Sequence, residues 1–341
     1  MRAVVTGGSG YFGDVLCTAL VQKGHDVVNL DISPVSQPGV DFVEADIRDR
    51  ERVRAAFAHA DVVFHNVAQV PLARDAGLFD SVNREGTAAM LWAAERAGVG
   101  KVVYTSSSAV YGVPARNPVT EATAPAPREA YGRAKLDGEL LCSAAVTRGQ
   151  DVTIVRPRTI VGHGRLGIFA ILFDWVADGA DTVVFDGGRN RYQFVHAADL
   201  AHACLLAGAR PGPAAYNIGA QEFGTMRETL QALCDHAGTR ARVRSVPSRM
   251  AAPLMKAASR SGLAPFADYH WLMYARDFWF DTTAAQQDLG WHAQFSNADM
   301  VIEAYDWFLV HRDDLSGPSH HRSGVKQGVL RVGKWALGAT K

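Results

Sequence analysis

The sequence predicts an α/β fold, a doubly wound parallel sheet with a smaller, mixed C-terminal lobe. Short runs rich in Val, Ile and Phe alternate with helical patterns through the first half of the chain. The apolar side chains fill both faces of these runs, which is typical of strands covered by helices on both sides. A length of 341 residues allows one large α/β domain or two smaller ones.

The expected elements follow one another in a regular order. Strands are expected at residues 2–6, 26–30, 41–44, 61–65, 101–105 and 151–155, and helices between them at 12–23, 82–97 and 129–148. After about residue 161, short strands at 182–185 and 215–218 are interspersed with helices at 226–236 and 297–311. We therefore expect a first domain at 1–160, to which later segments contribute, a second lobe at 161–317 and a basic tail at 318–341.

Charge and composition exclude several classes of protein. Basic and acidic residues total 35 each, so the formal net charge is zero and no field attracts nucleic acid. The four cysteines are far apart and the histidines form no cluster, which predicts free thiols, a reducing compartment and no metal site. Neither a signal peptide nor a run of about 18 apolar residues is present. We expect a soluble cytoplasmic protein whose basic tail is a frayed terminus rather than a membrane-contacting helix.

A glycine-rich turn follows the first expected strand and opens the first helix. Residues 6–13 read T-G-G-S-G-Y-F-G. Gly7 permits the tight turn, Gly10 lets the backbone approach a pyrophosphate, and Gly13 lets helix and strand pack closely. The N–H groups around Tyr11 and Phe12, at the start of this helix, are expected to face the phosphates.

An acidic residue, Asp31, ends the second strand, where a carboxylate can accept both ribose hydroxyls of an adenosine. Asp31 repels a 2′-phosphate, and the following Ile32 and Ser33 supply no arginine to hold one. The pattern therefore predicts a Rossmann-like domain that binds NAD rather than NADP. Asp46 and Ile47, after the third strand, either contact the adenine or belong to an ordinary loop.

A tyrosine and a lysine four residues apart, Tyr131 and Lys135, lie on one face of the helix expected at 129–148. A phenol with a pKa near 10 is a poor base at neutral pH. A neighbouring ammonium and a positive nicotinamide ring stabilise the phenolate and make it a usable base. An ordinary amphipathic helix can show the same spacing, but the position after the fifth strand and three serines favours catalysis. A serine of that run can hydrogen-bond the substrate oxygen.

These residues and several further motifs resemble the NAD-dependent epimerase/dehydratase family of extended short-chain dehydrogenases/reductases. The matching segments include F-H-N-V-A-Q (64–69), N-x-x-G-T (83–87), S-S-S-A-V-Y-G (106–112), Y-G-R-A-K (131–135), R-P-R-T-I-V-G (156–162) and F-V-H-A-A-D-L-A (194–201). The resemblance extends over nearly the whole chain. It implies that Val67, Ala68 and Asn83 also contact NAD, and that the protein is a homodimer.

The resemblance also implies catalytic roles. Tyr131 is expected to act as acid and base, Lys135 as its ribose-binding partner, and Ser107, three residues before the valine of V-Y-G, as the active-site hydroxyl. Family dehydratases carry an acidic residue immediately before this valine, whereas this chain has Ala109, preceded by Ser108. We therefore expect no elimination, only oxidation and reduction at a carbinol, used once by a dehydrogenase or twice by an epimerase.

Substrate recognition is expected to depend on arginines. Nucleotide-sugar members carry an Arg-Asp pair a few residues before the family's Val-His, where this chain has Tyr192-Gln193. The candidate substrate-binding residues are Ser107, Ser108, Arg158, Arg165, Arg191 and Arg276, the arginines to hold a diphosphate. An aromatic-rich stretch at 269–280 either packs in the core or lines a pocket for an apolar substrate.

Three functions remain open at this point. We expect an NAD-dependent nucleotide-sugar epimerase, similar to hexose 4-epimerases, that works through a transient keto-sugar. The alternative is an NAD(P)-dependent dehydrogenase or reductase of a 3-hydroxy/3-oxo steroid-like or long-chain substrate, which consumes cofactor stoichiometrically. A redox-sensing or scaffold protein without chemistry is disfavoured, because Ser107, Tyr131 and Lys135 are all present.

Overall fold

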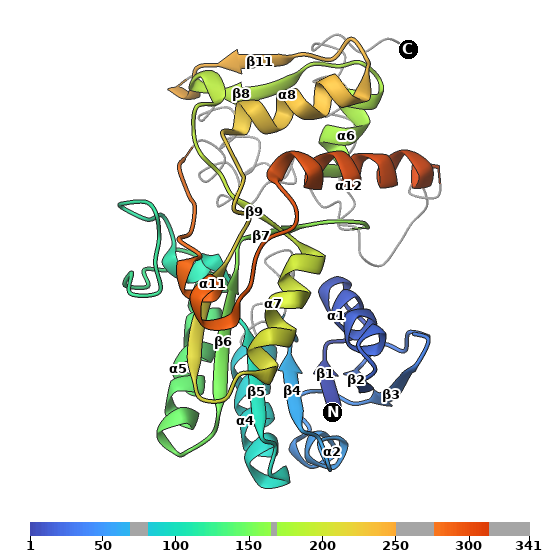
Figure 1. The fold of residues 1–341 in the computed structure, drawn as a ribbon, viewed down its shortest axis with the longest axis vertical. Helices are drawn as coiled ribbons and strands as arrows, with labels where there is room; N and C mark the ends of the chain where they lie inside the picture. The colour runs from blue at the N-terminus through green and yellow to red at the C-terminus, as the bar shows by residue number, and fades with distance from the viewer. Residues whose placement is uncertain (69–80, 165–168, 250–275, 314–341) are drawn as a thin grey trace. The chain divides into compact units, whose positions relative to one another are not determined.

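Seven parallel strands form the central sheet, in the spatial order β10-β6-β5-β4-β1-β2-β3 (Figure 1). They are β1 (Arg2–Thr6), β2 (Asp26–Asp31), β3 (Val40–Glu44), β4 (Val62–His65), β5 (Lys101–Thr105), β6 (Val152–Pro157) and β10 (Ala214–Ile218). The computed structural model describes residues 1–68, 81–164, 169–249 and 276–313. The strand order reverses between β1 and β4, so the predicted doubly wound parallel sheet is confirmed.

Helices cover both faces of this sheet. They are α1 (Tyr11–Gln22), α2 (Arg50–Ala56), α4 (Gly86–Ala97), α5 (Ala130–Thr147), α7 (Ala197–Ala209) and the short α11 (Thr283–Leu289). Val4 and Val63 belong to a buried cluster with residues of α2, α4 and α5. On the other face α1 packs against α7, where a Cβ on Gly208 would meet the Phe64 ring at 2.8 Å. Alternate strand residues therefore face opposite helix layers, as the apolar strand pattern predicts.

Two compact units divide the chain. The first consists of Met1–Thr159, Ala197–Gly219 and Phe280–Ala293, and the second of Ile160–His196, Ala220–Trp279 and Gln294–Lys341. The first unit therefore contains the whole central sheet. The strand expected at 215–218 is β10, an edge strand of this sheet, because its backbone pairs in parallel with β6.

In its described residues, the second unit combines short strands with helices. It contains α6 (Phe169–Ala177), α8 (Met226–Ala237), α12 (Asn297–His311), β8 (Thr182–Phe185), β9 (Phe194–His196) and β11 (Val243–Val246), with β7 (Thr159–Val161) at its edge. β8 pairs with β11 and β7 with β9. The buried Phe173 ring lies 5.7 Å from Tyr305 and 5.9 Å from Phe308 of α12, so aromatic packing joins α6 to α12.

Several stretches differ from the sequence-based expectation, among them the start of α4 and the whole of α7. The helix expected at 82–97 begins with a π-helical turn, η1 (Ser81–Glu85), before α4 starts at Gly86. Helix α7 was not expected, because its sequence AADLAHACLLAGA is apolar on most sides and shows little helical periodicity. Most of its residues are nevertheless buried, and it packs against α1 and against strands of the central sheet.

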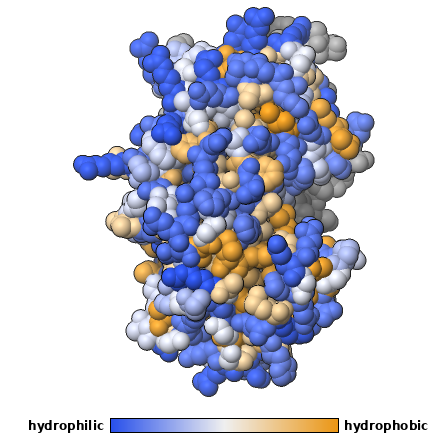
Figure 2. All heavy atoms as spheres, in the orientation of Figure 1, coloured by the Kyte–Doolittle hydropathy of each residue, from blue (hydrophilic) through white to orange (hydrophobic). Residues whose placement is uncertain are grey.

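The helix lengths and the surface show whether a described segment could span a membrane. Within residues 1–68, 81–164, 169–249 and 276–313, no helix has the length and apolar character needed to span a bilayer. Figure 2 shows hydrophilic and hydrophobic residues interspersed over the face that it presents. The basic tail at 318–341 lies outside the described residues.

A histidine is buried at the carboxyl end of β4. His65 is 1% exposed, and its Nδ1 lies 2.7 Å from the Thr6 hydroxyl. Its ring stacks on Tyr104 with centroids 5.8 Å apart. Burial, aided by the positive charge of Lys135, lowers the pKa of His65 to about 3. The side chain is therefore neutral inside the folded protein at any pH above that value.

This burial predicts a loss of stability in acid. Between pH 6.5 and about 3 the unfolded chain binds a proton that the folded chain does not, so unfolding becomes easier as the pH falls. Between pH 7 and about pH 4.5, the free energy of unfolding should fall in both proteins. We expect the fall to be about 2–3 kcal/mol smaller in His65→Gln than in wild type. Urea midpoints at both pH values measure this difference. The exposed His202→Gln is the control, and equal losses in wild type and His65→Gln would contradict the prediction.

Candidate active site

The turn after β1 forms a tight backbone cradle at the start of α1. Gly7 has a φ of +76°, and its N–H donates to the Leu30 carbonyl at 2.9 Å. A Cβ on Gly13 would lie 2.0 Å from the Gly7 carbonyl oxygen, so no larger side chain fits there. Gly10 is the N-cap residue and provides no capping side chain. The first N–H groups of α1 can therefore receive an anion, and the cradle fits the pyrophosphate of a dinucleotide.

Asp31 is held rigidly at the end of β2. Its Oδ2 accepts the Ser9 N–H at 3.2 Å and its Oδ1 accepts the Ser33 N–H at 3.1 Å. Each carboxylate oxygen retains acceptor capacity, so the oriented carboxylate can still receive two ribose hydroxyls. Ile32, the next residue, is 63% exposed and supplies no positive charge. This geometry fits the adenosine of NAD.

An amide cluster behind Asp31 supports the cradle and was missed from the sequence. The Asn29 Nδ2 donates to the Ser9 hydroxyl at 3.1 Å and to the Gln37 Oε1 at 2.9 Å. The Gln37 Nε2 in turn donates to the Gly8 carbonyl at 3.1 Å and to the Asp14 Oδ1 at 2.6 Å. The cluster joins β2 to the glycine turn and to α1. An isolated Gln in a loop gives no sequence signal for such a role.

The remaining predicted cofactor residues lie around the cradle or on neighbouring segments. Tyr11 is half-buried and Phe12 is buried at the start of α1. Val67 and Ala68 follow β4, which pairs with β1. Asn83 is buried within the π-helical turn η1, a type of turn that recurs at functional sites.

Asp46 and Ile47 have different surroundings. The Asp46 carboxylate accepts from the Arg48 guanidinium at 2.9 and 2.5 Å. Hydrogen bonds from Arg48 accordingly hold the pKa of Asp46 below its usual value. Ile47 is 4% exposed and belongs to the buried cluster under α2 and α4. The Ile47 side chain is therefore a core residue, and its backbone and Asp46 are the parts that can reach an adenine.

Lys135 is a buried cation at the carboxyl end of β5. It is 3% exposed, its Nζ donates to the Thr105 carbonyl at 2.8 Å, and it lies 5.0 Å from the centroid of the Tyr104 ring. Burial lowers the pKa of Lys135 to about 8, while nearby groups such as Glu139 oppose this shift. Tyr131, one turn earlier on α5, is half-buried. The predicted Tyr–Lys pair therefore lies on one helix face, with the lysine anchored to the sheet.

The serine segment lies against the same turn of α5. The Ser107 Oγ accepts the Ala109 N–H at 3.2 Å and caps the short 3-10 helix η2 (Ser108–Tyr111). A Cβ on Gly132 would lie 2.4 Å from the Ala109 carbonyl oxygen, so the residue after Tyr131 abuts this segment. Ser107 is half-buried and Ser108 is 5% exposed. The structure thus brings Tyr131, Lys135 and the serine segment together at the end of β5.

A buried polar network continues from this point into the first unit. Glu139, one turn after Lys135, accepts from Arg156 at 2.8 and 2.7 Å and from the Ser106 hydroxyl at 2.6 Å. Arg156 also donates to the Tyr111 hydroxyl at 2.8 Å. The sequence analysis missed this network. Its one sequence signal is that Glu139 repeats the four-residue spacing of the Tyr–Lys pair.

The predicted arginines have different environments in the two units. In the first unit, Arg158 is 1% exposed, and its guanidinium lies 5.5 Å from the centroid of the Phe280 ring. In the second unit, the Arg191 guanidinium lies 4.8 Å from the Phe223 centroid and 4.5 Å from the Trp279 centroid. Aromatic rings thus hold both side chains.

Tyr192 occupies the position where nucleotide-sugar members carry arginine. It is 7% exposed, and its ring packs against Phe194 with centroids 5.3 Å apart. Arg276 is exposed, and its carbonyl accepts from the Asn190 side chain at 3.4 Å. Arg165 and residues 269–275 of the aromatic-rich stretch lie outside the described residues.

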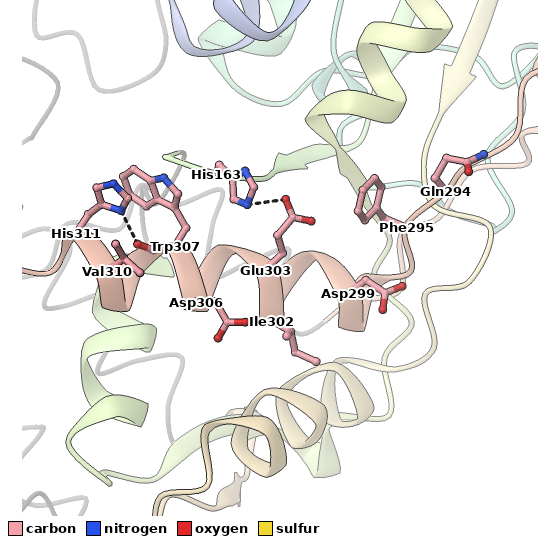
Figure 3. A pocket seen from close by; sticks show the side chains of 10 residues that line it. All are labelled: His163, Gln294, Phe295, Asp299, Ile302, Glu303, Asp306, Trp307, Val310 and His311. Carbon is pink, nitrogen blue, oxygen red and sulfur yellow. Dashed lines mark hydrogen bonds and ion pairs between the residues drawn. The ribbon is translucent and has the colours of Figure 1, made fainter. Parts of the chain in front are cut away.

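A separate open hollow of about 610 Å³ lies along α12 in the second unit (Figure 3). Glu303 accepts from His163 at 2.8 Å on its wall, and Trp307 stacks on His311 with centroids 4.0 Å apart. The other lining residues are Gln294, Phe295, Asp299, Ile302, Asp306 and Val310, and none of the predicted site residues is among them. Among the described residues, no group of three His, Cys, Asp or Glu side chains is arranged to hold a metal ion.

Comparisons with known proteins place these observations in context. The model of the NAD dependent epimerase/dehydratase family matches residues 3–219. The chain is 50% identical over 340 residues to an uncharacterized protein, y4nG, of Sinorhizobium fredii, covering 98% of this chain and 86% of that protein. It is 29% identical over 330 residues to a UDP-glucose 4-epimerase of Mycolicibacterium smegmatis, covering 90% of this chain and 98% of that one. A UDP-glucose-4-epimerase of Stenotrophomonas maltophila, solved with bound NAD and formylated UDP-arabinopyranose, shares 27% identity and a TM-score of 0.74, covering 92% of this chain and 99% of that one.

The cradle predicts a graded effect of glycine substitutions on NAD binding. Gly10→Ala places a Cβ 3.3 Å from the Gly7 carbonyl, at a φ of −77° that alanine tolerates, so the fold is kept. We expect the Kd for NAD to rise about tenfold or more, because the methyl group occupies the approach of the pyrophosphate. Gly100→Ala, whose Cβ also lies 3.3 Å from a backbone carbonyl, is the matched control. Calorimetric titration with NAD measures both, and equal affinities would refute the prediction.

Proposed function

This chain belongs to the NAD dependent epimerase/dehydratase family, and we propose that within it the protein is a nucleotide-sugar epimerase, similar to hexose 4-epimerases. The observation that carries the proposal is the buried Lys135, anchored 2.8 Å from the Thr105 carbonyl with Tyr131 one turn before it on α5. A catalytic base and its activating cation thus stand beside the serine segment at the sheet edge. The first unit is assigned to NAD binding and chemistry, and the second mainly to the substrate.

The proposed chemistry begins with proton transfer to Tyr131. The phenolate oxygen takes the proton of a sugar hydroxyl, and bound NAD supplies the reversible hydride acceptor for that carbon. Ser107 donates a hydrogen bond to the oxygen as it changes from alcohol to carbonyl. The keto-sugar then rotates in its pocket, and Tyr131 returns the proton when hydride is delivered to the opposite face of the same carbon. Electrons and protons balance over the cycle, so no net cofactor is consumed.

Lys135 supplies the charge that makes Tyr131 basic. With its pKa lowered to about 8 by burial, Lys135 is still largely protonated at neutral pH. An ammonium in a low-dielectric site acts strongly on a phenol one helical turn away. The hydrogen bond to the Thr105 carbonyl keeps this charge in place.

The residue before the valine of V-Y-G argues against dehydration. Ala109 is 3% exposed, and its carbonyl faces the turn of α5 at Gly132. Elimination needs a base at carbon, and the methyl group of an alanine supplies none. Reversible oxidation at a carbinol is therefore the reaction that these residues support.

The proposed substrate carries a diphosphate, which arginine side chains are proposed to bind. Arg191 lies against two aromatic rings, which orients its guanidinium for planar, bidentate recognition of phosphate. Arg158, which the sequence analysis also assigned to the diphosphate, is 1% exposed beside Phe280, and this burial argues against direct phosphate contact by its side chain. Arg276 and Arg165 are proposed to assist, and Ser108 to contact the sugar. A homodimer in the cytoplasm remains the predicted state of the protein.

A second candidate is favoured by Tyr192. This buried aromatic residue replaces the phosphate-binding arginine of nucleotide-sugar members and packs on Phe194. An aromatic side chain at this position suits a reductase of a 3-oxo steroid-like or long-chain substrate. That function changes NADH absorbance stoichiometrically with product, whereas an epimerase leaves it unchanged.

Tyr131→Phe tests the acid–base assignment. We expect kcat for UDP-glucose/UDP-galactose interconversion to fall about 10²- to 10⁴-fold, because the hydroxyl that moves the proton is removed. NAD binding should stay within about twofold of wild type, since the cradle is untouched. A coupled assay measures turnover while absorbance follows NADH. Retained turnover would overturn the epimerase mechanism, and stoichiometric NADH change would favour the reductase.

Lys135→Met tests how much the buried charge of Lys135 lowers the free energy of unfolding. A pKa lowered from 10.5 to about 8 means that the folded protein holds this proton less tightly than the unfolded chain. Removing the charge should therefore leave the apoprotein as stable as wild type at pH 7 or up to about 3 kcal/mol more stable. The advantage should shrink as the pH rises from about 8 to 10, because wild-type stability then increases.

Chemical denaturation at pH 7 and about pH 10 measures both trends. Lys101→Met is the contrasting variant, because it leaves Asp151 without its ion-pair partner at 2.6 Å and should lower stability. A Lys135→Met protein less stable than wild type at pH 7 would contradict the prediction.

A further inference from the structure

A buried ion pair lies below the catalytic turn of α5. Glu139 is 4% exposed and Arg156 is 8% exposed, and two parallel hydrogen bonds of 2.8 and 2.7 Å join them. Replacing such a pair by well-packed apolar residues is often neutral or stabilising, so stability alone does not account for it. Its other hydrogen bonds indicate what it holds.

The pair grips both ends of the segment that carries Ser107. At the first end, the Ser106 hydroxyl donates to the Glu139 Oε1 at 2.6 Å. At the other end, the Tyr111 hydroxyl accepts from the Arg156 Nη1 at 2.8 Å. Residues 106–111 are thus fixed to α5 through the glutamate and to β6 through the arginine.

Further contacts make this attachment stiff. The Ser106 N–H donates to the Val155 carbonyl of β6 at 2.8 Å, and the Tyr111 hydroxyl donates to the Asn217 Oδ1 of β10 at 2.9 Å. The Arg156 guanidinium also lies 5.4 Å from the Tyr111 ring centroid. Neither member of the pair reaches the cradle, so both act through other residues.

We propose that Glu139 and Arg156 are positioning residues that set the Ser107 hydroxyl against Tyr131 and Lys135 by clamping residues 106–111 at both ends. The proposal rests on the proposed oxidation–reduction chemistry. Glu139 and Lys135 are one turn apart on α5, so the helix that holds the base also holds the clamp. Loosening the clamp should therefore disturb the alignment of Ser107 and leave NAD binding unchanged.

Two variants release the segment without breaking the ion pair. Ser106→Ala removes the hydroxyl on Glu139, and Tyr111→Phe removes the hydroxyl on Arg156. Tyr216→Phe is the matched control, because this buried tyrosine in the same unit donates instead to Asp288 at 3.2 Å. Thermal melts confirm that each variant is folded at the assay temperature.

The kinetic measurement is UDP-glucose/UDP-galactose interconversion. We expect kcat to fall about 10- to 100-fold in Ser106→Ala and Tyr111→Phe, with KM and the Kd for NAD within about twofold of wild type. The double variant should lose less than the product of the single effects, because both changes release the same segment. Kinetics equal to those of Tyr216→Phe, or losses confined to KM, would overturn the proposal.

A second measurement needs no substrate. Hydrogen exchange at the Val110 and Gly112 amides, which donate to the Ser107 and Ala109 carbonyls, should rise about tenfold in both variants, while exchange at Asp14 stays unchanged. Unchanged exchange at residues 106–112 would refute the clamp whatever the substrate is. The proposed function fails if wild type does not interconvert UDP-sugars or if Tyr131→Phe is fully active. In that case the hydrogen-exchange result alone decides whether the clamp exists.

Discussion

The hydrogen bond from the Lys135 ammonium to the Thr105 carbonyl is the contact on which the proposed chemistry of the first unit depends. It holds a cation inside the protein, at the carboxyl end of β5, where water cannot screen its charge. The same bond fixes the second turn of α5 to the sheet. In the proposed mechanism, the basicity of Tyr131 and its location thus have one structural cause, and burial of the Lys135 charge is the thermodynamic cost.

Parallel pairing puts the other parts of the proposed site at the same edge of the sheet as this cation. β1 and β5 both pair with β4 in parallel, so the glycine turn and the serine segment emerge at the same edge of the sheet. The reversal of strand order between β1 and β4 leaves that edge open to a ligand. Asp31 ends β2 at this edge as well, and its two backbone hydrogen bonds orient it.

Local patterns made the fold and the cradle predictable, because strand alternation, glycine spacing and the Tyr–Lys interval each lie within a few residues. The network around Glu139 and Arg156 was not predictable, since its bonds join residues 17 to 106 positions apart. The same holds for Gln37, which reaches a carbonyl 29 positions away. Helix α7 escaped prediction for a different reason, because an alanine-rich helix buried on most sides has no polar face to mark its period.

Residues 106–111 lie in the first unit and Arg191 lies in the second, so substitutions in the two places are expected to have different effects during evolution. Residues 106–111 are tied to a helix and to two strands, so replacing one partner alone disturbs several bonds at once. Selection for a new substrate would therefore meet strong epistasis in the first unit. Arg191 and the Phe223 and Trp279 rings around it belong to the second unit and share none of these bonds. On the proposed assignment of substrate binding to the second unit, specificity can change there while the reaction stays the same.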